Sequence, residues 1–140
     1  MEEKGALEHS TETEEAVVYE VSYHLLPMLD EAHVEQSVSR FREAITKVGG
    51  EFIAEGAPQR IALAYPIAVW ENGTWTKYTD AHFGWLKFVL NSEKISSVGQ
   101  LLKEEKSVIR FLVVKTVRED TRASVRQFVM REVKRGDTFM

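Results

Sequence analysis

The feature that most restricts the fold is a proline, Pro66, inside a strand-like stretch at residues 51–70. Proline has no amide hydrogen to donate to the ladder of a sheet, so strands tolerate it at an edge or at a bulge. The same stretch is broken near Gly56 and Pro58. The sequence therefore predicts a long, interrupted strand, with Pro66 at the edge of a sheet or at a bulge.

A tight turn follows this strand. Asn72 and Gly73 both tolerate positive φ, and such a pair is a strong signal for a two-residue β-hairpin. Trp70 and Trp75 flank the turn and are expected to pair across the two strands. The returning strand extends to about residue 90. Its two faces are expected to carry Leu86 and Phe88 on one side, and Phe83, Trp85, Lys87 and Val89 on the other.

Two helix-like stretches and two further strand-like stretches complete the pattern. Residues 17–25 and 107–117 are rich in β-branched and aromatic residues, which predicts the first and last strands. The first of these stretches alternates, so Tyr19, Val21, Tyr23 and Leu25 are expected to share one face of the sheet. Asp30 is a good N-cap for the first helix, and Ser92 can cap the second. The first helix carries an apolar stripe at spacings of three and four residues: Val34, Val38, Phe41, Ile45 and Val48.

The order of elements is strand, helix, strand, strand, helix, strand. This order predicts an α+β, ferredoxin-like βαββαβ fold, in which a four-stranded antiparallel sheet of order 4-1-3-2 carries two helices on one face. The second strand is an edge in that arrangement, as Pro66 requires. We therefore expect one ferredoxin-like domain at residues 16–117.

The two ends of the chain differ from this domain in charge. The formal net charge is −4, and residues 1–15 hold six acidic residues and one basic residue, which predicts an acidic, disordered tail. Residues 118–140 hold six basic and four acidic residues. Because their apolar residues recur at helical spacing, we expect a basic amphipathic helix that docks on the domain. The stripe and its basic border are Val125, Phe128, Val129, Val133, Arg122, Arg126, Arg131 and Lys134.

The sequence offers little support for an enzyme or a membrane protein. It has no cysteine, which excludes thiolate metal sites, and it lacks the common nucleotide-binding, hydrolase and metalloprotease motifs. No apolar run approaches the ~18 residues of a membrane span, and the N-terminus lacks a signal-peptide core. We therefore expect a cytoplasmic binding protein without a metal, cofactor or small-molecule substrate. A concave pocket holding Arg60, His82 and an acid would instead favour an enzyme or a small-molecule binder.

Residues 81–88, AHFGWLKF, partly match the strand that reads RNA in RNA-recognition motifs. The matching residues, in order, are Phe83, Gly84, Trp85, Leu86 and Phe88. Ala81 and His82 replace the basic residue and the first glycine of that pattern, and residues 17–25 lack its aromatic partner segment. We therefore interpret the segment as a buried strand. The alternative is a free-standing single-stranded RNA-binding module that stacks bases on Phe83 and Trp85.

A more specific resemblance involves the segment LAYPI at residues 63–67. This segment, placed after YEVSYHLLPMLD and before FGWLKFVLNSEKISSVGQLLKEEKSVIRFLVVKT, resembles ribosomal protein six of the bacterial small subunit over residues 17–117. The resemblance implies a ferredoxin-like, non-enzymatic ribosomal protein in the cytoplasm. It also implies binding to small-subunit ribosomal RNA together with ribosomal protein eighteen, through the sheet edge and the C-terminal tail.

These considerations together give a set of expected contact residues. For RNA they are Arg60, Lys87, Arg110, Lys115 and Trp85, and for the partner protein they are Tyr65, Pro66, Arg122, Arg126, Phe128 and Arg131. The sequence departs from the family pattern just before LAYPI, where Ile61 and Ala62 stand in place of basic residues. The hairpin with the two tryptophans is also longer than expected. Both departures favour protein contacts over phosphate contacts along the second strand.

Overall fold

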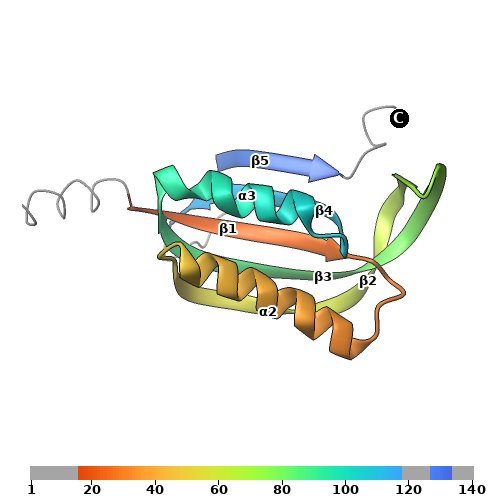
Figure 1. Ribbon diagram of the computed structural model, residues 1–140, viewed down its shortest axis with the longest axis horizontal. Helices are drawn as coiled ribbons and strands as arrows, with labels where there is room; N and C mark the ends of the chain where they lie inside the picture. Colours follow the sequence, from red (N-terminus) through yellow and green to blue (C-terminus); the bar gives the residue numbers. More distant parts are fainter. Residues whose placement is uncertain (1–15, 118–126, 134–140) are drawn as a thin grey trace, which may run out of the picture.

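A computed structural model describes residues 16–117 and 127–133, which form a five-stranded antiparallel sheet with two α-helices on one face (Figure 1). The predicted acidic tail at residues 1–15 lies outside the described residues. In chain order the elements are β1 (Ala16–Leu25), α2 (Glu31–Lys47), β2 (Glu51–Glu71), β3 (Thr74–Asn91), the 3₁₀ helix η1 (Ser92–Lys94), α3 (Ile95–Glu104), β4 (Val108–Thr116) and β5 (Gln127–Val133).

The strand order is β2-β3-β1-β4-β5. Its first four strands follow the order predicted for a ferredoxin-like sheet, and β2 is an edge strand as predicted. The ladder between β2 and β3 shifts register between Ala62 and Ile67, so Pro66 lies in a bulge of this edge strand. The proline therefore meets both conditions that its missing amide hydrogen allows.

The fifth strand corrects two predictions, a sheet of four strands and a C-terminal helix within residues 118–140. Gln127–Val133 form β5, which pairs antiparallel with β4. Valine and phenylalanine favour strands, so their three-and-four spacing is weak evidence for a helix here. The edge of β4 also supplies backbone hydrogen-bond partners, and Val129 and Met130 pack against the main core.

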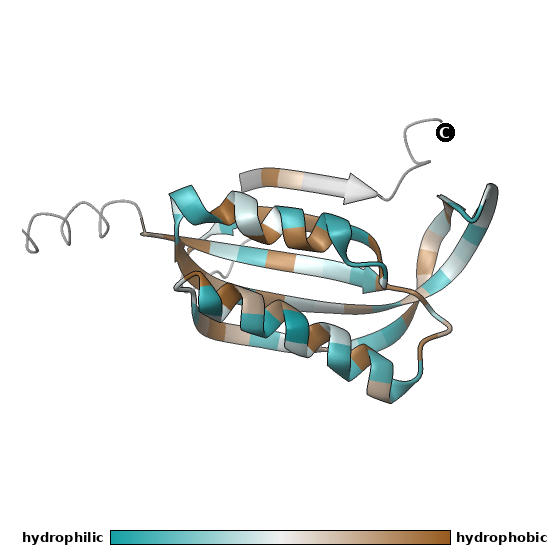
Figure 2. Cartoon of the chain, in the orientation of Figure 1, coloured by the Kyte–Doolittle hydropathy of each residue, from teal (hydrophilic) through white to brown (hydrophobic). Residues whose placement is uncertain are grey.

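The main core lies between the sheet and the two helices. The predicted alternation of β1 is confirmed, since Tyr19, Val21 and Tyr23 are buried while their neighbours are more exposed. Figure 2 shows brown, apolar residues recurring between teal, hydrophilic ones along both helices. The predicted stripe of the first helix packs in this core: Val34, Val38, Phe41 and Ile45 are buried, and Val48 is partly buried against them.

The helix starts are set by polar caps. The carboxylate of Asp30 accepts a hydrogen bond from the amide of His33 at 2.9 Å, which confirms the predicted N-cap of α2. At the second helical segment, Asn91 caps η1 by accepting from the amide of Glu93 at 2.8 Å. The predicted cap, Ser92, is instead the first residue of η1. The two neighbouring residues both have side chains suited to capping, so the sequence alone placed the cap one residue late.

Gly84, in the segment that partly matches an RNA-recognition strand, has a packing role. It lies opposite Tyr23 in the ladder of β1 and β3. A Cβ added to Gly84 would lie 2.3 Å from the Tyr23 hydroxyl oxygen, which is far inside a van der Waals contact. The glycine therefore makes room for a buried tyrosine that packs edge-on against Phe41, with ring centroids 5.2 Å apart. This contact supports the buried-strand interpretation.

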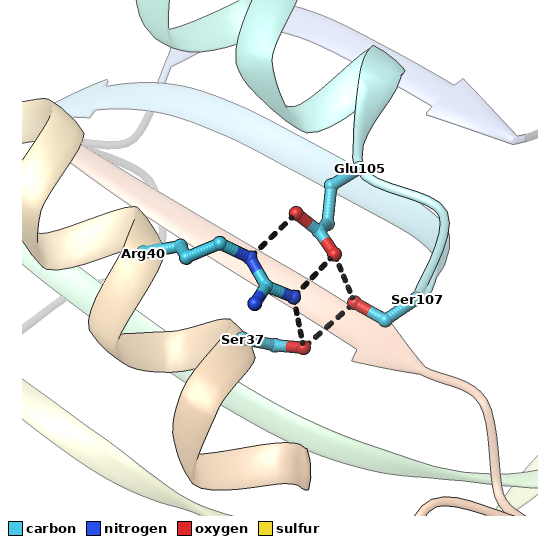
Figure 3. Close-up of polar contacts among 4 residues, drawn as sticks. All are labelled: Ser37, Arg40, Glu105 and Ser107. Carbon is cyan, nitrogen blue, oxygen red and sulfur yellow. Dashed lines mark hydrogen bonds and ion pairs between the residues drawn. The ribbon is translucent and has the colours of Figure 1, made fainter.

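A polar clasp of Ser37, Arg40, Glu105 and Ser107 joins α2 to the turn before β4 (Figure 3). Arg40 donates from Nε to Oε1 of Glu105 at 3.1 Å and from Nη2 to Oε2 at 2.8 Å. Ser107 donates to Oε2 at 2.9 Å, and its hydroxyl lies 2.8 Å from that of Ser37. Burial alone would raise the pKa of Glu105, but the hydrogen bonds from Arg40 and Ser107 outweigh it and hold that pKa below its ordinary value. The clasp fixes α2 over the sheet when Glu105 is ionised.

Candidate functional site

The β2 edge segment, residues 61–66, presents the LAYPI side chains at the border of the sheet. Tyr65 is 63% exposed, and Pro66 is exposed beside it. Leu63 is partly buried and packs against a second, smaller apolar cluster. The ring of Tyr65 therefore adds little to the core and is available to a partner, as expected for a contact residue. Because the bulge interrupts the ladder here, the segment offers side chains more than a regular backbone edge.

Arg60, an expected RNA contact, is engaged within the chain. It forms an ion pair with Asp80 on β3, with Nη2 2.7 Å from Oδ2, and it donates from Nη1 to the carbonyl of Pro27 at 3.1 Å. The pair neutralises the basic side chain next to the β2 edge segment in the sequence. This arrangement agrees with the expectation that the second strand makes few phosphate contacts.

A cavity of about 700 Å³ lies between the start of α2 and the first bulges of β2. It holds the combination that would favour an enzyme, since Arg60, His82 and two acids, Glu31 and Glu35, line it. Three of these polar side chains have partners: Arg60 is paired with Asp80, Nε2 of His82 donates to the carbonyl of Leu29 at 3.2 Å, and Oε2 of Glu35 lies 3.7 Å from Nη1 of Arg42. Within residues 16–117 and 127–133, no three potential metal ligands cluster. The cavity therefore presents no convergent set for acid–base or metal chemistry.

Three of the expected RNA contacts share the sheet face that the helices leave uncovered. Trp85 and Lys87 lie two residues apart on β3, so their side chains share one face of the sheet. Arg110 lies on the same face of β4, and β1 runs between β3 and β4. Trp85 is half-buried, and its indole nitrogen would lie 2.1 Å from a Cβ added to Gly56, so the ring lies directly over that glycine. Lys87 is only 7% exposed. The structure thus brings these residues to one face but leaves little of Lys87 accessible.

His24 links the strands on this same face. Nη2 of Arg110 lies 3.3 Å from Nε2 of His24, and the His24 and Phe83 rings have centroids 5.0 Å apart. Burial, and then the charge of Arg110, lower the pKa of His24 from 6.5 to about 4. The imidazole is therefore neutral at pH 7, and Nε2 accepts the hydrogen bond from Arg110. Phe83 packs on His24, so part of its ring is already covered.

The remaining expected residues are separated from this face. Lys115 pairs with Tyr19, a core residue, so it lies on the helix-bearing side of the sheet, where it is exposed. Phe128 and Arg131 belong to β5, while their side chains lie outside the described part of the structure. Arg122 and Arg126 lie outside the described residues altogether. The expected RNA set is therefore divided between the two faces of the sheet.

A surface that the sequence analysis did not assign as a site lies on the hairpin arm, residues 67–78. The arm bends away from the rest of the sheet, as the joined ends of β2 and β3 show on the right of Figure 1. Asn72 and Gly73 form its turn with φ of 53° and 79°, which confirms the predicted hairpin. Trp70 and Trp75 pair across it with ring centroids 5.0 Å apart, which confirms their predicted pairing.

The two faces of the hairpin arm have different roles. Its inner face buries Ile67, Val69 and Tyr78 in the second apolar cluster, which also includes Ala81 and Ile109 of the sheet. The outer face carries Ala68, Trp70, Trp75 and Lys77, which are cross-strand partners on the opposite side of the ribbon. The sequence signal for this outer face was the spacing of Trp75 and Lys77, which lie two residues apart and therefore share a side of the strand, whereas Tyr78 lies on the buried side.

The family model described as Ribosomal protein S6 matches residues 18–115. A small ribosomal subunit protein bS6 from Prochlorococcus marinus (strain MIT 9303) is 30% identical over 97 residues, which cover 69% of this chain and 72% of that protein. A second bS6 protein, from Sulfurovum sp. (strain NBC37-1), is 27% identical over 119 residues, 85% of this chain and 87% of its own length.

A solved structure is similar in fold. The crystal structure of 30S ribosomal protein S6 from Thermotoga maritima superposes with a TM-score of 0.61 at 15% sequence identity, and the match covers 71% of this chain and 87% of that one.

Helices of the described residues are all too short or too polar to cross a membrane.

Proposed function

The chain belongs to the ribosomal protein S6 family, and from this premise we propose that it is a structural component of the bacterial small ribosomal subunit, where it binds small-subunit ribosomal RNA together with ribosomal protein eighteen. Its place of action is accordingly the ribosome in the cytoplasm. The observation that carries the proposal is the exposed β2 edge segment within the region that matches the family.

The partner protein is proposed to dock on Tyr65 and Pro66. Tyrosine supplies a large, rigid contact area with a polar hydroxyl, and such residues are enriched among those that dominate binding energy. Pro66 removes a backbone donor from the edge and keeps the bulge irregular, which opposes nonspecific pairing with other strands. The C-terminal residues Arg122, Arg126, Phe128 and Arg131 are proposed to extend this partner surface.

RNA binding is proposed to be weak for the isolated protein. The candidates are Trp85, Lys87 and Arg110 on one face, with Lys115 and Arg60 elsewhere, and Arg60 is already paired with Asp80. With so few available cations, log K against log salt should fall with a slope of only about −2 to −4, at ~0.9 per phosphate. A slope near −8 would mean that the chain neutralises about twice as many phosphates.

The test is co-sedimentation of the full chain with small ribosomal subunits at moderate salt, followed by binding to purified ribosomal protein eighteen with the ribosomal RNA. Tyr65→Ala is expected to weaken binding of the partner protein by at least about fivefold, the threshold for an energetically important contact. Met28→Ala is the matched control, because Met28 is 66% exposed and Tyr65 63%. A full chain that never travels with small subunits would refute the proposed function.

A further inference from the structure

We propose that the outer face of the hairpin arm is a stacking site for unpaired nucleotides, in which Trp70 and Trp75 contact bases and Lys77 contacts a phosphate. This inference rests on the proposed RNA-binding function and adds a surface to it. Trp70 is 39% exposed and Trp75 44%, so both indoles keep substantial accessible area. Their rings meet edge to face at 68°.

The arm holds these rings in a defined position. Its inner residues Ile67, Val69 and Tyr78 are each no more than 6% exposed, and they anchor the ribbon to Ala81 and Ile109. Cross-strand pairing of Trp70 with Trp75 places both indoles on the opposite side of the ribbon. The anchoring that fixes the inner face therefore also fixes the orientation of the outer one, and less conformational entropy is lost when a ligand binds.

The charge on the outer face suits a phosphate. Lys77 is exposed, lies on the same side as Trp75 two residues away, and forms no ion pair with any described residue. Its backbone position is roughly 7 Å along the strand from that of Trp75, so a lysine side chain can reach a nucleotide stacked on that ring. The nearest acid of the arm, Glu71, accepts a hydrogen bond from the Tyr78 hydroxyl. That bond holds the carboxylate toward the inner face and away from Lys77.

The size of the surface favours a single-stranded nucleic acid over a protein partner. A stable protein interface buries roughly 800 Å² on each side, whereas two indoles and one ammonium on a two-stranded ribbon offer far less. Stacking needs only the face of a ring and accepts any base, and a lysine supplies the nonspecific attraction to the backbone. This chemistry identifies unpaired nucleotides of an RNA as the occupant.

The test uses tryptophan fluorescence of the full chain in a Trp85→Phe background, where the two remaining indoles are those of the arm. Titration with oligouridylate is expected to quench this emission, and an RNA duplex of equal length at the same concentration is expected to leave it unchanged. Trp70→Leu and Trp75→Leu should each weaken oligouridylate binding by about 5- to 150-fold, the usual loss for one stacked base. Because Phe52 is 37% exposed on the same strand, Phe52→Leu is the matched control and should bind normally.

Lys77→Ala is expected to make the slope of log K for oligouridylate against log salt shallower by about one unit. Lys47 is an exposed lysine at the end of α2, and Lys47→Ala should leave that slope unchanged. If circular dichroism shows that a leucine variant is unfolded, the phenylalanine variants are used to test the stacking site instead. Trp70→Phe and Trp75→Phe keep a ring and should retain binding. Folded phenylalanine variants that bind as poorly as an unfolded chain would overturn the proposal.

Failure of this inference is distinguishable from failure of the proposed function. If the full chain does not co-sediment with small subunits, the proposed function is wrong. If it does, and the leucine variants bind oligouridylate like the parent, only the stacking site is wrong. Leucine variants that lose ribosomal protein eighteen while they keep oligouridylate would make the arm a protein contact, which also overturns the proposal.

Discussion

The helix-covered body of the molecule and the hairpin arm are built from the same strands, β2 and β3 contributing to both, yet they are stabilised very differently. Seventeen buried residues from the sheet and both helices form the core of the body, whereas five form the cluster beneath the arm. Elements with few buried apolar contacts open locally at lower free energy than the global unfolding of a domain. The body therefore sets the stability of the fold, and the arm depends on its own small cluster for its local stability.

The difference also separates the residues that maintain the fold from those proposed to bind. The large apolar side chains of the body, such as Phe88 and Phe111, are almost fully buried. Three aromatic residues of the edge and the arm, Tyr65, Trp70 and Trp75, are exposed. Substitutions in the body should mainly change stability, and substitutions at the edge and the arm should mainly change binding.

The largest effect is expected in the body. Phe88→Ala should lower the free energy of unfolding by about 3–5 kcal/mol, because it leaves a cavity beside Tyr19 and Phe52, whose rings pack against it. Urea unfolding monitored by circular dichroism measures the loss. A cost below about 1 kcal/mol would show that this core does not dominate the fold.

A second effect in the body depends on pH. The pKa of His24 is lowered from 6.5 to about 4, so an unfolded chain takes up a proton as the pH falls through 6.5 while the folded chain does not. Stability should therefore be full above pH 6.5 and should decline by up to about 3 kcal/mol as the pH approaches 4. Urea unfolding across this range tests the slope, and His24→Leu should remove the part due to this residue. A parent and variant with equal slopes above pH 5 would contradict the assignment.

A smaller effect is expected beneath the arm. Ile67→Ala should cost about 2 kcal/mol, at the lower end for such truncations, because the small cluster can partly close around the cavity. Amide hydrogen exchange should accelerate in residues 67–78 and remain unchanged in α2. Equal acceleration in α2 would mean that the arm and the body unfold as one unit and would remove the distinction between them.

The smallest effect on stability is expected at the edge. Tyr65→Ala should change the free energy of unfolding by no more than about 0.5 kcal/mol, since its ring is 63% exposed. The same protein should nevertheless bind ribosomal protein eighteen less well than Met28→Ala does. A loss of stability of several kcal/mol would place Tyr65 among the structural residues.

Local sequence patterns predicted much of both regions. The body followed from local patterns: the alternation of β1, the stripe of α2 and the cap at Asp30 are each determined within a few neighbouring residues. The constraint from Pro66 identified the edge strand for a chemical reason. The turn at Asn72 and Gly73 was predicted equally well, because only a few residue types tolerate its positive φ.

The features that were wrong or missed depend on long-range pairing. β5 forms because the edge of β4 lies beside it, which spacing within residues 127–133 does not reveal. The ion pair of Arg60 with Asp80 depends on the register between β2 and β3, which three irregularities shift. The pairing of Lys115 with Tyr19 places Lys115 on the face opposite Lys87, which local spacing also does not reveal.

The most direct test of the central claim, that the β2 edge segment and the hairpin arm form the contact surface of the chain, is amide hydrogen exchange of the full protein, free and assembled with small-subunit ribosomal RNA and ribosomal protein eighteen. The account predicts slower exchange in residues 61–78 on assembly and little change on the solvent-exposed face of α2. Assembly that leaves exchange in residues 61–78 unaltered would contradict it.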